Sequence, residues 1–276
     1  MRAFTVDLKE EYSFLKGGKL SCMLMDMPWD QPKAWKRPAL IVVPGGAYWM
    51  VSKREGEPVA SAFFAKGFQT FILDYLTAPK GIAYPEQLLE LASAVDYVKK
   101  NADAFCVNKD EVFVVGFSAG GHLTGNLCVE HTHVCDKAGV ALDCKPTAVG
   151  LCYPVISQIH GHQGSYNNLL QGYTNEAKEE LLKTLNLNEA VSVDTPPAFL
   201  WATATDPSVP ADNAIRYALA LAEKGIAYEL HVYPQGYHGL STGADEVNEE
   251  PYRNQRVCAW VGDCIQFFKL YIQEAL

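Results

Sequence analysis

The chain has 276 residues, of which 49% are hydrophobic and 20% are charged, and its formal net charge is −9 at pH 7. A chain of this length can bury a full core, and we expect one domain over residues 1–276. The negative charge, with no cluster of five or more Lys or Arg to offset it, disfavours nucleic acid and membrane surfaces as partners.

Apolar runs of strand length alternate with longer amphipathic stretches along most of the chain. Ahead of this series, Phe4–Leu8 and Leu20–Met25 are predicted as antiparallel edge strands, joined by a charged turn that contains Gly17 and Gly18. The following strands are predicted at Ala39–Val43, Gln69–Asp74, Val112–Gly116, Ala148–Tyr153, Ala198–Ala202 and Tyr228–Tyr233. Helices are predicted at Glu55–Lys66, Pro85–Lys100, Ala119–Glu130, Ala211–Lys224 and Tyr252–Leu276. This alternation of strands and helices predicts an α/β fold, with a mostly parallel sheet and helices on both of its faces.

One segment, residues 157–195, interrupts this alternation of strands and helices. It lies between two predicted strands and contains the helical run EAKEELLKTLNL followed by the turn DTPP. A connection of this length at the carboxyl edge of a sheet is uncommon unless it has a function. We therefore predict a small cap over the sheet edge.

The stretch EVFVVGFSAGGHLTG places Ser118 between Gly116 and Gly120, where a strand must stop and a helix must start. A sharp strand-to-helix turn strains the backbone at its central residue and requires small neighbours. Such a turn holds a serine hydroxyl above the sheet, at a helix N-terminus that favours a developing anion. The pattern predicts Ser118 as a nucleophile; a purely structural turn is the alternative.

A serine hydroxyl needs a histidine to accept its proton and a carboxylate to orient that histidine. In this architecture both follow the serine, each after a later strand. Asp206 follows the strand AFLWATA, and His238 lies in the glycine-flanked loop after YELHVY. We predict Asp206 as the orienting acid and His238 as the base. The alternatives are a helix cap for Asp206 and an ordinary surface position for His238.

The strand ALIVV runs into a glycine-rich turn at Pro44–Tyr48. Backbone N–H groups in such a turn can point at the carbonyl oxygen of a bound ester. We predict Gly46 and Ala47 as oxyanion donors, together with Ala119, the residue after the predicted nucleophile. The alternative is a glycine turn needed only for a tight strand exit.

Eight cysteines occur singly, with no CxxC pair, and the first twenty residues lack the apolar run of a signal peptide. We therefore expect a cytoplasmic protein whose cysteines are mostly reduced and buried. Cys128, His131, His133 and Cys135 lie within eight residues. Their spacing differs from the two separated ligand pairs of structural zinc sites, so we expect helix-end packing and no metal.

Together, PGGAYWMVSKREGEP, GFSAGGHL, LCYPVIS, HQGSYNNLL, DTPPAFLWATATDPSVP and GYHGL resemble the bacterial α/β-hydrolase esterases of the acetyl-esterase and acetylxylan-esterase type. The resemblance spans nearly the whole chain and implies the roles given above for Ser118, Asp206 and His238. Two positions depart from related enzymes. Pro44 stands where a histidine begins the oxyanion turn, and Ala47 stands where many relatives have a third glycine.

The resemblance implies a serine carboxylesterase that acts on short acyl groups, often acetyl, of sugars or small alcohols, without a cofactor. Tyr48, Trp49, Arg54 and His162 are predicted to line a pocket suited to a sugar, although such residues also pack within a cap. A peptidase or amidase with the same triad and a hydrolase fold that only binds a ligand are the alternatives. A homodimer through edge strands or the cap is compatible with the sequence.

Overall fold

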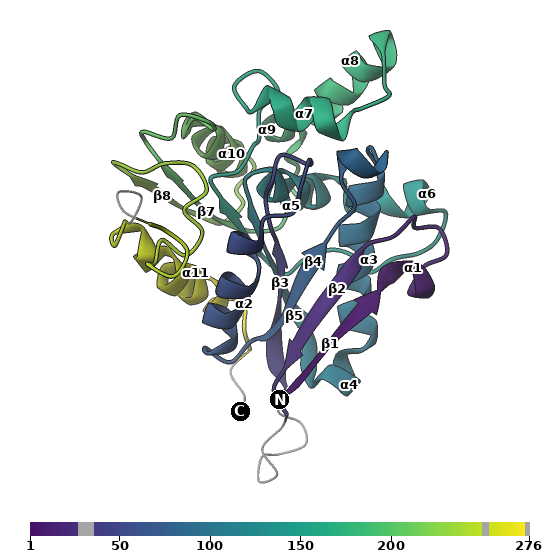
Figure 1. Cartoon of the computed structure of the whole chain (residues 1–276), viewed down its shortest axis with the longest axis vertical. Helices are drawn as coiled ribbons and strands as arrows, with labels where there is room; N and C mark the ends of the chain where they lie inside the picture. Colours follow the sequence, from purple (N-terminus) through teal and green to yellow (C-terminus); the bar gives the residue numbers. More distant parts are fainter. Residues whose placement is uncertain (27–35, 250–253, 274–276) are drawn as a thin grey trace.

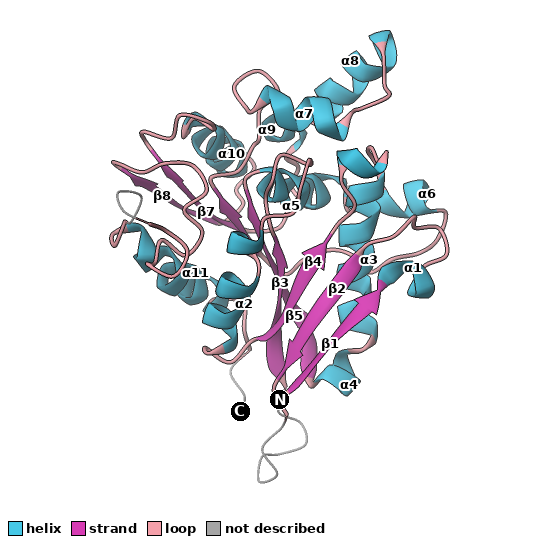
Figure 2. Cartoon of the chain, in the orientation of Figure 1, coloured by secondary structure: helices cyan, strands magenta, loops and turns pink. Residues whose placement is uncertain are grey.

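The computed structural model describes residues 1–26, 36–249 and 254–273, and its centre is an eight-stranded sheet (Figures 1 and 2). The strands are β1 (Arg2–Asp7), β2 (Lys19–Leu24), β3 (Arg37–Val43), β4 (Gln69–Asp74), β5 (Val107–Phe117), β6 (Val149–Cys152), β7 (Ala198–Thr203) and β8 (Tyr228–Tyr233). They lie in the order β1-β2-β4-β3-β5-β6-β7-β8. β3 to β8 are parallel, whereas β1 pairs antiparallel with β2, and β2 pairs antiparallel with β4.

Helices cover both faces of this sheet. The longer ones are α2 (Glu57–Phe64), α3 (Glu86–Lys100), α5 (Ala119–Glu130), α10 (Asp212–Glu223) and α11 (Trp260–Lys269). Shorter helices are α1 (Leu8–Glu11), α4 (Ala102–Phe105) and α6 (Val134–Ala138), with 3₁₀ turns η1 (Lys53–Glu55), η2 (Ala78–Lys80) and η3 (Val257–Ala259). In Figure 1, α2 and α11 lie together on one side of the sheet and α3 lies on the other. The predicted α/β fold class is confirmed.

The core has one apolar cluster on each face, and β3 contributes to both. Ala39, Ile41 and Val43 belong to the cluster under α3, α5 and α10, whereas Leu40 and Val42 belong to the cluster under α2 and α11. All five side chains are fully buried, because successive residues of a strand point to opposite faces and both faces are covered. This explains the continuous apolar run in the sequence.

Several predicted boundaries need correction. The predicted helix Glu55–Lys66 is the turn η1 followed by α2, because Gly56 breaks the helix between them. The predicted helix Tyr252–Leu276 is shorter, with η3 and α11 covering only 257–269; residues 250–253 and 274–276 lie outside the described residues. The predicted charged turn between the edge strands contains the short helix α1.

The predicted cap, residues 157–195, contains α7 (Gln163–Leu169), α8 (Asn175–Thr184) and α9 (Leu187–Ala190). These three helices lie at one end of the molecule, with α8 outermost (Figure 1). Buried leucines on either side of α8 attach the segment, whereas α8 itself has no buried residue. Among the described helices, none combines the length and apolar character that a membrane crossing requires.

The attachment of α11 can be tested at Phe268, which is fully buried and stacks on Phe113 with 4.5 Å between ring centres. We expect Phe268→Ala to lower the free energy of unfolding by about 3–5 kcal/mol, because it removes apolar contacts and leaves a cavity. Urea denaturation measures this change. Leu270→Ala is the control, since Leu270 is 74% exposed, and its effect should stay within about 0.5 kcal/mol. Equal effects of the two substitutions would contradict this packing.

Candidate active site

Ser118 lies at the turn between β5 and α5, with a strained backbone of φ 53° and ψ −117°. Close packing explains the glycines on either side. A Cβ on Gly116 would lie 2.3 Å from the carbonyl oxygen of Gly120, and a Cβ on Gly120 would lie 2.2 Å from that of Val43. Only glycine lets α5 approach the sheet this closely. The structure therefore has the sharp turn predicted around Ser118.

The three residues predicted as a catalytic triad lie side by side in the structure. His238 Nε2 is 2.8 Å from Ser118 Oγ, and His238 Nδ1 is 2.7 Å from Asp206 Oδ2. The Asp206 side chain is fully buried, and its Oδ1 accepts the backbone N–H groups of Ser208 and Val209 at 2.8 and 3.0 Å. These bonds fix the carboxylate. A neutral imidazole that donates from Nδ1 to Asp206 presents Nε2 as the acceptor for the Ser118 hydroxyl proton.

The loops that bear Asp206 and His238 are joined to each other by hydrogen bonds. The hydroxyls of Thr203 and Thr205 both donate to the carbonyl oxygen of Gly236, at 3.0 and 3.1 Å. The N–H of Gly236 is also 2.9 Å from Thr205 Oγ1. Since β7 and β8 are parallel neighbours, their following loops meet at one edge of the sheet. The hydrogen bonds of these threonines therefore fix the position of one loop relative to the other.

The glycine-rich turn after β3 adopts an unusual backbone, with φ 124° at Gly46 and 54° at Ala47. Its curvature is tight, because a Cβ on Gly46 would lie 2.1 Å from the carbonyl oxygen of Met50. Within the described part of the chain, the N–H groups of Gly46, Ala47 and Ala119 form no hydrogen bond. Three donors are therefore available beside Ser118.

A cavity of about 500 Å³ opens over Ser118, His238 and the turn at Gly46 and Ala47. Its lining residues are Gly46, Ala47, Trp49, Met50, Ser52, Arg54, Glu55, Ser118, His162, Ser208, His238 and Gly239. The structure thus brings together three of the four side chains predicted to line a pocket: Trp49, Arg54 and His162. Tyr48 is not among them, and that prediction is wrong.

Tyr48 is buried beneath the turn and 1% exposed, because the positive φ of 57° at this residue turns its side chain into the core. Its hydroxyl lies 2.8 Å from Nδ1 of His122, whose Nε2 donates to the carbonyl oxygen of Leu185. Burial lowers the pKa of His122 to about 4, so the ring is neutral at pH 7 and Nδ1 accepts the Tyr48 proton. Tyr48 therefore joins the turn to α5 instead of lining the cavity.

Tyr166 belongs to α7 and packs in the core under the cap. It is 1% exposed, and its hydroxyl donates to the carbonyl oxygen of Ile156 at 3.1 Å. Asn168, on the same helix, reaches the glycine-rich turn after β3 directly, because its Nδ2 donates to the carbonyl oxygen of Ala47 at 2.8 Å. The cap therefore contributes a support for the turn that the sequence did not indicate.

Sequence reasoning also missed the buried polar residues Glu55 and Tyr153. Glu55 lies in η1 and lines the cavity, whereas Tyr153 follows β6 and has a left-handed backbone with φ 37°. The sequence pattern places each in a regular element, Glu55 at the start of a helix and Tyr153 at the end of a strand. No local pattern distinguishes a buried glutamate from the many exposed ones in such positions.

The Cys128, His131, His133 and Cys135 grouping does not converge on one point. Cys128 is buried in the core, His131 Nε2 lies 3.1 Å from the carbonyl oxygen of Asp194, and Cys135 contacts the backbone of Leu142. Among the described residues, no group of three or more His, Cys, Asp or Glu side chains is arranged to hold a metal ion.

Comparison with known proteins agrees with this geometry. The BD-FAE family profile matches residues 25–221, which is more than half of the chain. The chain belongs to the BD-FAE family. The acetyl ester-xyloside bifunctional hydrolase from Caldicellulosiruptor lactoaceticus, a solved structure, is 30% identical, with a TM-score of 0.83 over 99% of this chain and 98% of that one. Its likeness confirms the α/β-hydrolase fold and the predicted resemblance.

Two curated relatives are longer proteins. Endo-1,4-beta-xylanase B from Butyrivibrio fibrisolvens is 37% identical over 216 residues, which is 76% of this chain and 34% of that protein. The acetylxylan esterase from Xylanibacter ruminicola is 28% identical over 249 residues, which is 88% of this chain and 47% of that protein. This BD-FAE chain therefore spans less than half the length of either relative.

The close packing of α5 can be tested with Gly120→Ala. The added Cβ would meet the carbonyl oxygens of Val43 and Pro44 at 2.2 and 2.4 Å, so the turn at Ser118 must shift. We expect a loss of about 1–3 kcal/mol in unfolding free energy and loss of reaction with an active-serine probe. Gly262→Ala in α11 is the matched control, because its Cβ would meet nothing within 4 Å. Unchanged labelling of Gly120→Ala would contradict this interpretation.

Proposed function

We propose that the chain is a serine carboxylesterase that hydrolyses short-chain acyl esters, above all acetyl esters, with esters of sugars or oligosaccharides among its substrates. The observation that carries the proposal is the hydrogen-bonded series Ser118, His238 and Asp206, at 2.8 and 2.7 Å, at the wall of an open cavity. The names of the relatives, an acetylxylan esterase and an acetyl ester-xyloside hydrolase, support the same chemistry.

In the first half of the proposed reaction, Ser118 Oγ attacks the ester carbonyl carbon while its proton passes to His238 Nε2. Asp206 holds the resulting imidazolium in place. The tetrahedral intermediate then collapses, the bond to the alcohol oxygen breaks, and that oxygen takes the proton from His238. The products of this half are the free alcohol and an acyl group on Ser118.

In the second half, a water molecule gives its proton to His238 and attacks the acyl carbon. Collapse of the second intermediate releases the carboxylic acid and returns the proton to Ser118 Oγ. The N–H groups of Gly46, Ala47 and Ala119 are the proposed donors to the oxyanion in both halves. Support for this role comes from their lack of another acceptor in the described residues and from the position of Ala119 at the N-terminus of α5.

The proposed substrate class rests on the lining of the cavity as well as on the relatives. Trp49 is 59% exposed at the cavity, and Arg54 and His162 add polar groups to its wall. An aromatic face together with hydrogen-bonding groups suits a polyhydroxylated alcohol. Cytoplasmic location and a homodimer stay predictions from the sequence.

Substitution of the proposed nucleophile tests the mechanism. We expect Ser118→Ala to remain folded and to lower the kcat for p-nitrophenyl acetate by at least about a thousandfold, because no group remains to form the acyl-enzyme. Circular dichroism checks the fold of the variant. Near-normal turnover by folded Ser118→Ala would rule out the assigned triad.

A series of p-nitrophenyl esters from acetyl to octanoyl tests the substrate class, alongside acetylated xylo-oligosaccharides and aminoacyl anilides. We expect kcat/KM to be highest for acetyl, and we expect release of acetate from the oligosaccharides. A preference for octanoyl would contradict the short-acyl proposal. Faster cleavage of the anilides would instead indicate a peptidase with the same three residues.

A further inference from the structure

The Glu55 carboxylate is buried beside Ser118 and bridges two parts of the site. It is 4% exposed, its Oε2 accepts the N–H of Gly45 at 2.8 Å, and its Oε1 accepts the hydroxyl of Tyr153 at 2.7 Å. Within the described residues, no Lys, Arg or His forms an ion pair with Glu55. The two hydrogen bonds from Gly45 and Tyr153 therefore compensate for the burial of this group.

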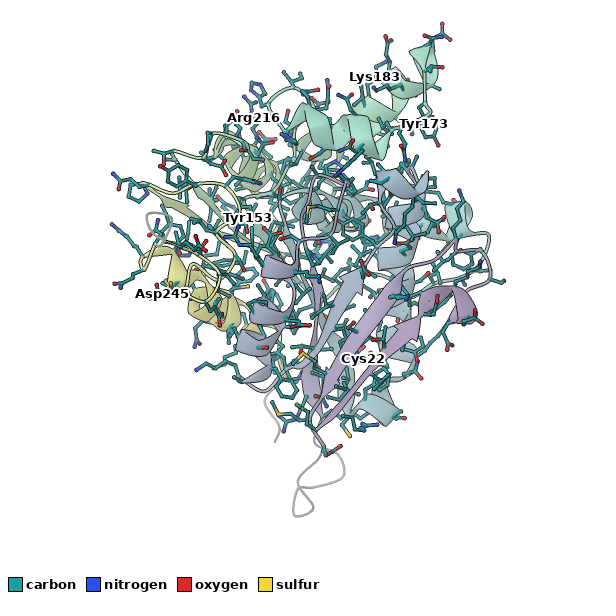
Figure 3. All side chains as sticks on the ribbon, in the orientation of Figure 1. Cys22, Tyr153, Tyr173, Lys183, Arg216 and Asp245 are labelled. Atoms are coloured by element: carbon teal, nitrogen blue, oxygen red, sulfur yellow. The ribbon has the colours of Figure 1, made fainter. Side chains whose placement is uncertain are left out.

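Tyr153 continues the bridge to the loop that bears His238. Its hydroxyl oxygen accepts the N–H of Ser241 at 3.0 Å, and its ring meets the His238 ring edge-on with 5.0 Å between centres. Burial, and next the charge of Glu55, raise the pKa of Tyr153 well above its usual value, so this hydroxyl stays protonated and donates to Glu55. Tyr153 is buried in the body of the molecule, whereas Lys183 lies on α8, which projects from it (Figure 3).

A second contact connects the same two segments. Ser241 Oγ donates to the carbonyl oxygen of Arg54 at 2.6 Å, next to Glu55 in the chain. The Arg54 side chain reaches further along the loop, to the carbonyl oxygen of Val247 and to Asn248 Oδ1, at 2.9 and 2.8 Å. Arg54 and its neighbour Glu55, which follow the oxyanion turn in the chain, are thus attached at several points to the loop that follows His238.

We propose that Glu55 is a positioning residue that couples the oxyanion turn to His238 through Tyr153. This inference rests on the proposed esterase function. Glu55 fixes the start of the turn at Gly45, and Gly45 has no space for a side chain, since a Cβ there would lie 2.9 Å from both Glu55 Oε2 and Ser118 Cβ. Through Tyr153, the same carboxylate limits how far the imidazole can move from Ser118.

This coupling matters because both the N–H donors and the imidazole act on one tetrahedral intermediate. A misplacement of about 1 Å can lower a rate on the order of a hundredfold. A donor that contacts only the oxyanion affects kcat more than KM, because the ground-state ester does not bear the charge. A merely structural role for Glu55 predicts a loss of stability instead, with no selective effect on kcat.

Glu55→Gln and Tyr153→Phe test the coupling, singly and together. The amide of Gln can still accept from Gly45, but its Nε2 donates to the Tyr153 oxygen, so the hydroxyl proton loses its acceptor. Tyr153→Phe removes only the hydroxyl and keeps the ring against His238. Glu111→Gln is the matched control, because Glu111 is also a buried carboxylate but lies in the first half of β5, at the start of the buried run that leads to Ser118.

The readouts are kcat and KM for p-nitrophenyl acetate, the melting temperature, and affinity for an alkyl trifluoromethyl ketone, which forms a tetrahedral adduct with an active serine. We expect each single variant to lower kcat and ketone affinity by about tenfold or more, with KM within about twofold. The double variant should resemble the more impaired single variant, since the two residues act in one bridge. Glu111→Gln should keep kcat within about twofold.

If folded Tyr153→Phe has a kcat within about twofold of that of the unsubstituted chain, the coupling is overturned. This variant decides the matter if Glu55→Gln does not fold. Losses that multiply in the double variant would overturn it as well. These outcomes are distinct from failure of the proposed function, in which the unsubstituted chain itself would not hydrolyse the ester or Ser118→Ala would remain active.

Discussion

The close approach of α5 to the sheet is the constraint on which the rest of the site depends. Glycines at 116 and 120 let the helix backbone contact the strands at distances that any Cβ would block. The strained backbone at Ser118 is held by its neighbours, because its N–H donates to Cys152 and its carbonyl oxygen accepts from His122 and Val155. A turn over-determined in this way can keep an unfavourable conformation that a free chain would leave.

The parallel sheet then brings distant residues to the same edge. β5, β6, β7 and β8 are successive neighbours in the sheet, so the segments after them emerge together. Asp206 is the fixed point of this edge: its carboxylate is fully buried and accepts from two backbone N–H groups as well as from His238. An anchored carboxylate sets the orientation of the imidazole, and the threonine contacts to Gly236 limit the movement of its loop.

The fold and the main residues of the site could be predicted because their signals are local. Ser118, Asp206 and His238 each follow an apolar run of strand length, so each lies after the carboxyl end of a strand. Because these strands are parallel, their carboxyl ends meet at one edge of the sheet, and the three residues come together there. The orientation of Tyr48 and the burial of Glu55 could not be predicted in this way. Tyr48 points inward because the turn has a left-handed backbone there, and Glu55 is buried because Tyr153, distant in sequence, satisfies it.

The predicted cap, residues 157–195, supports the glycine-rich turn after β3 and also lines part of the cavity. Asn168 holds the carbonyl of Ala47, and the pair Tyr48 and His122 connects the turn to the carbonyl of Leu185. If the cap moved away, Ala47 would lose its amide donor and the buried His122 would lose its acceptor. Since an unpaired polar group in the core costs free energy, these bonds favour the cap position seen here and couple it to the geometry of the turn.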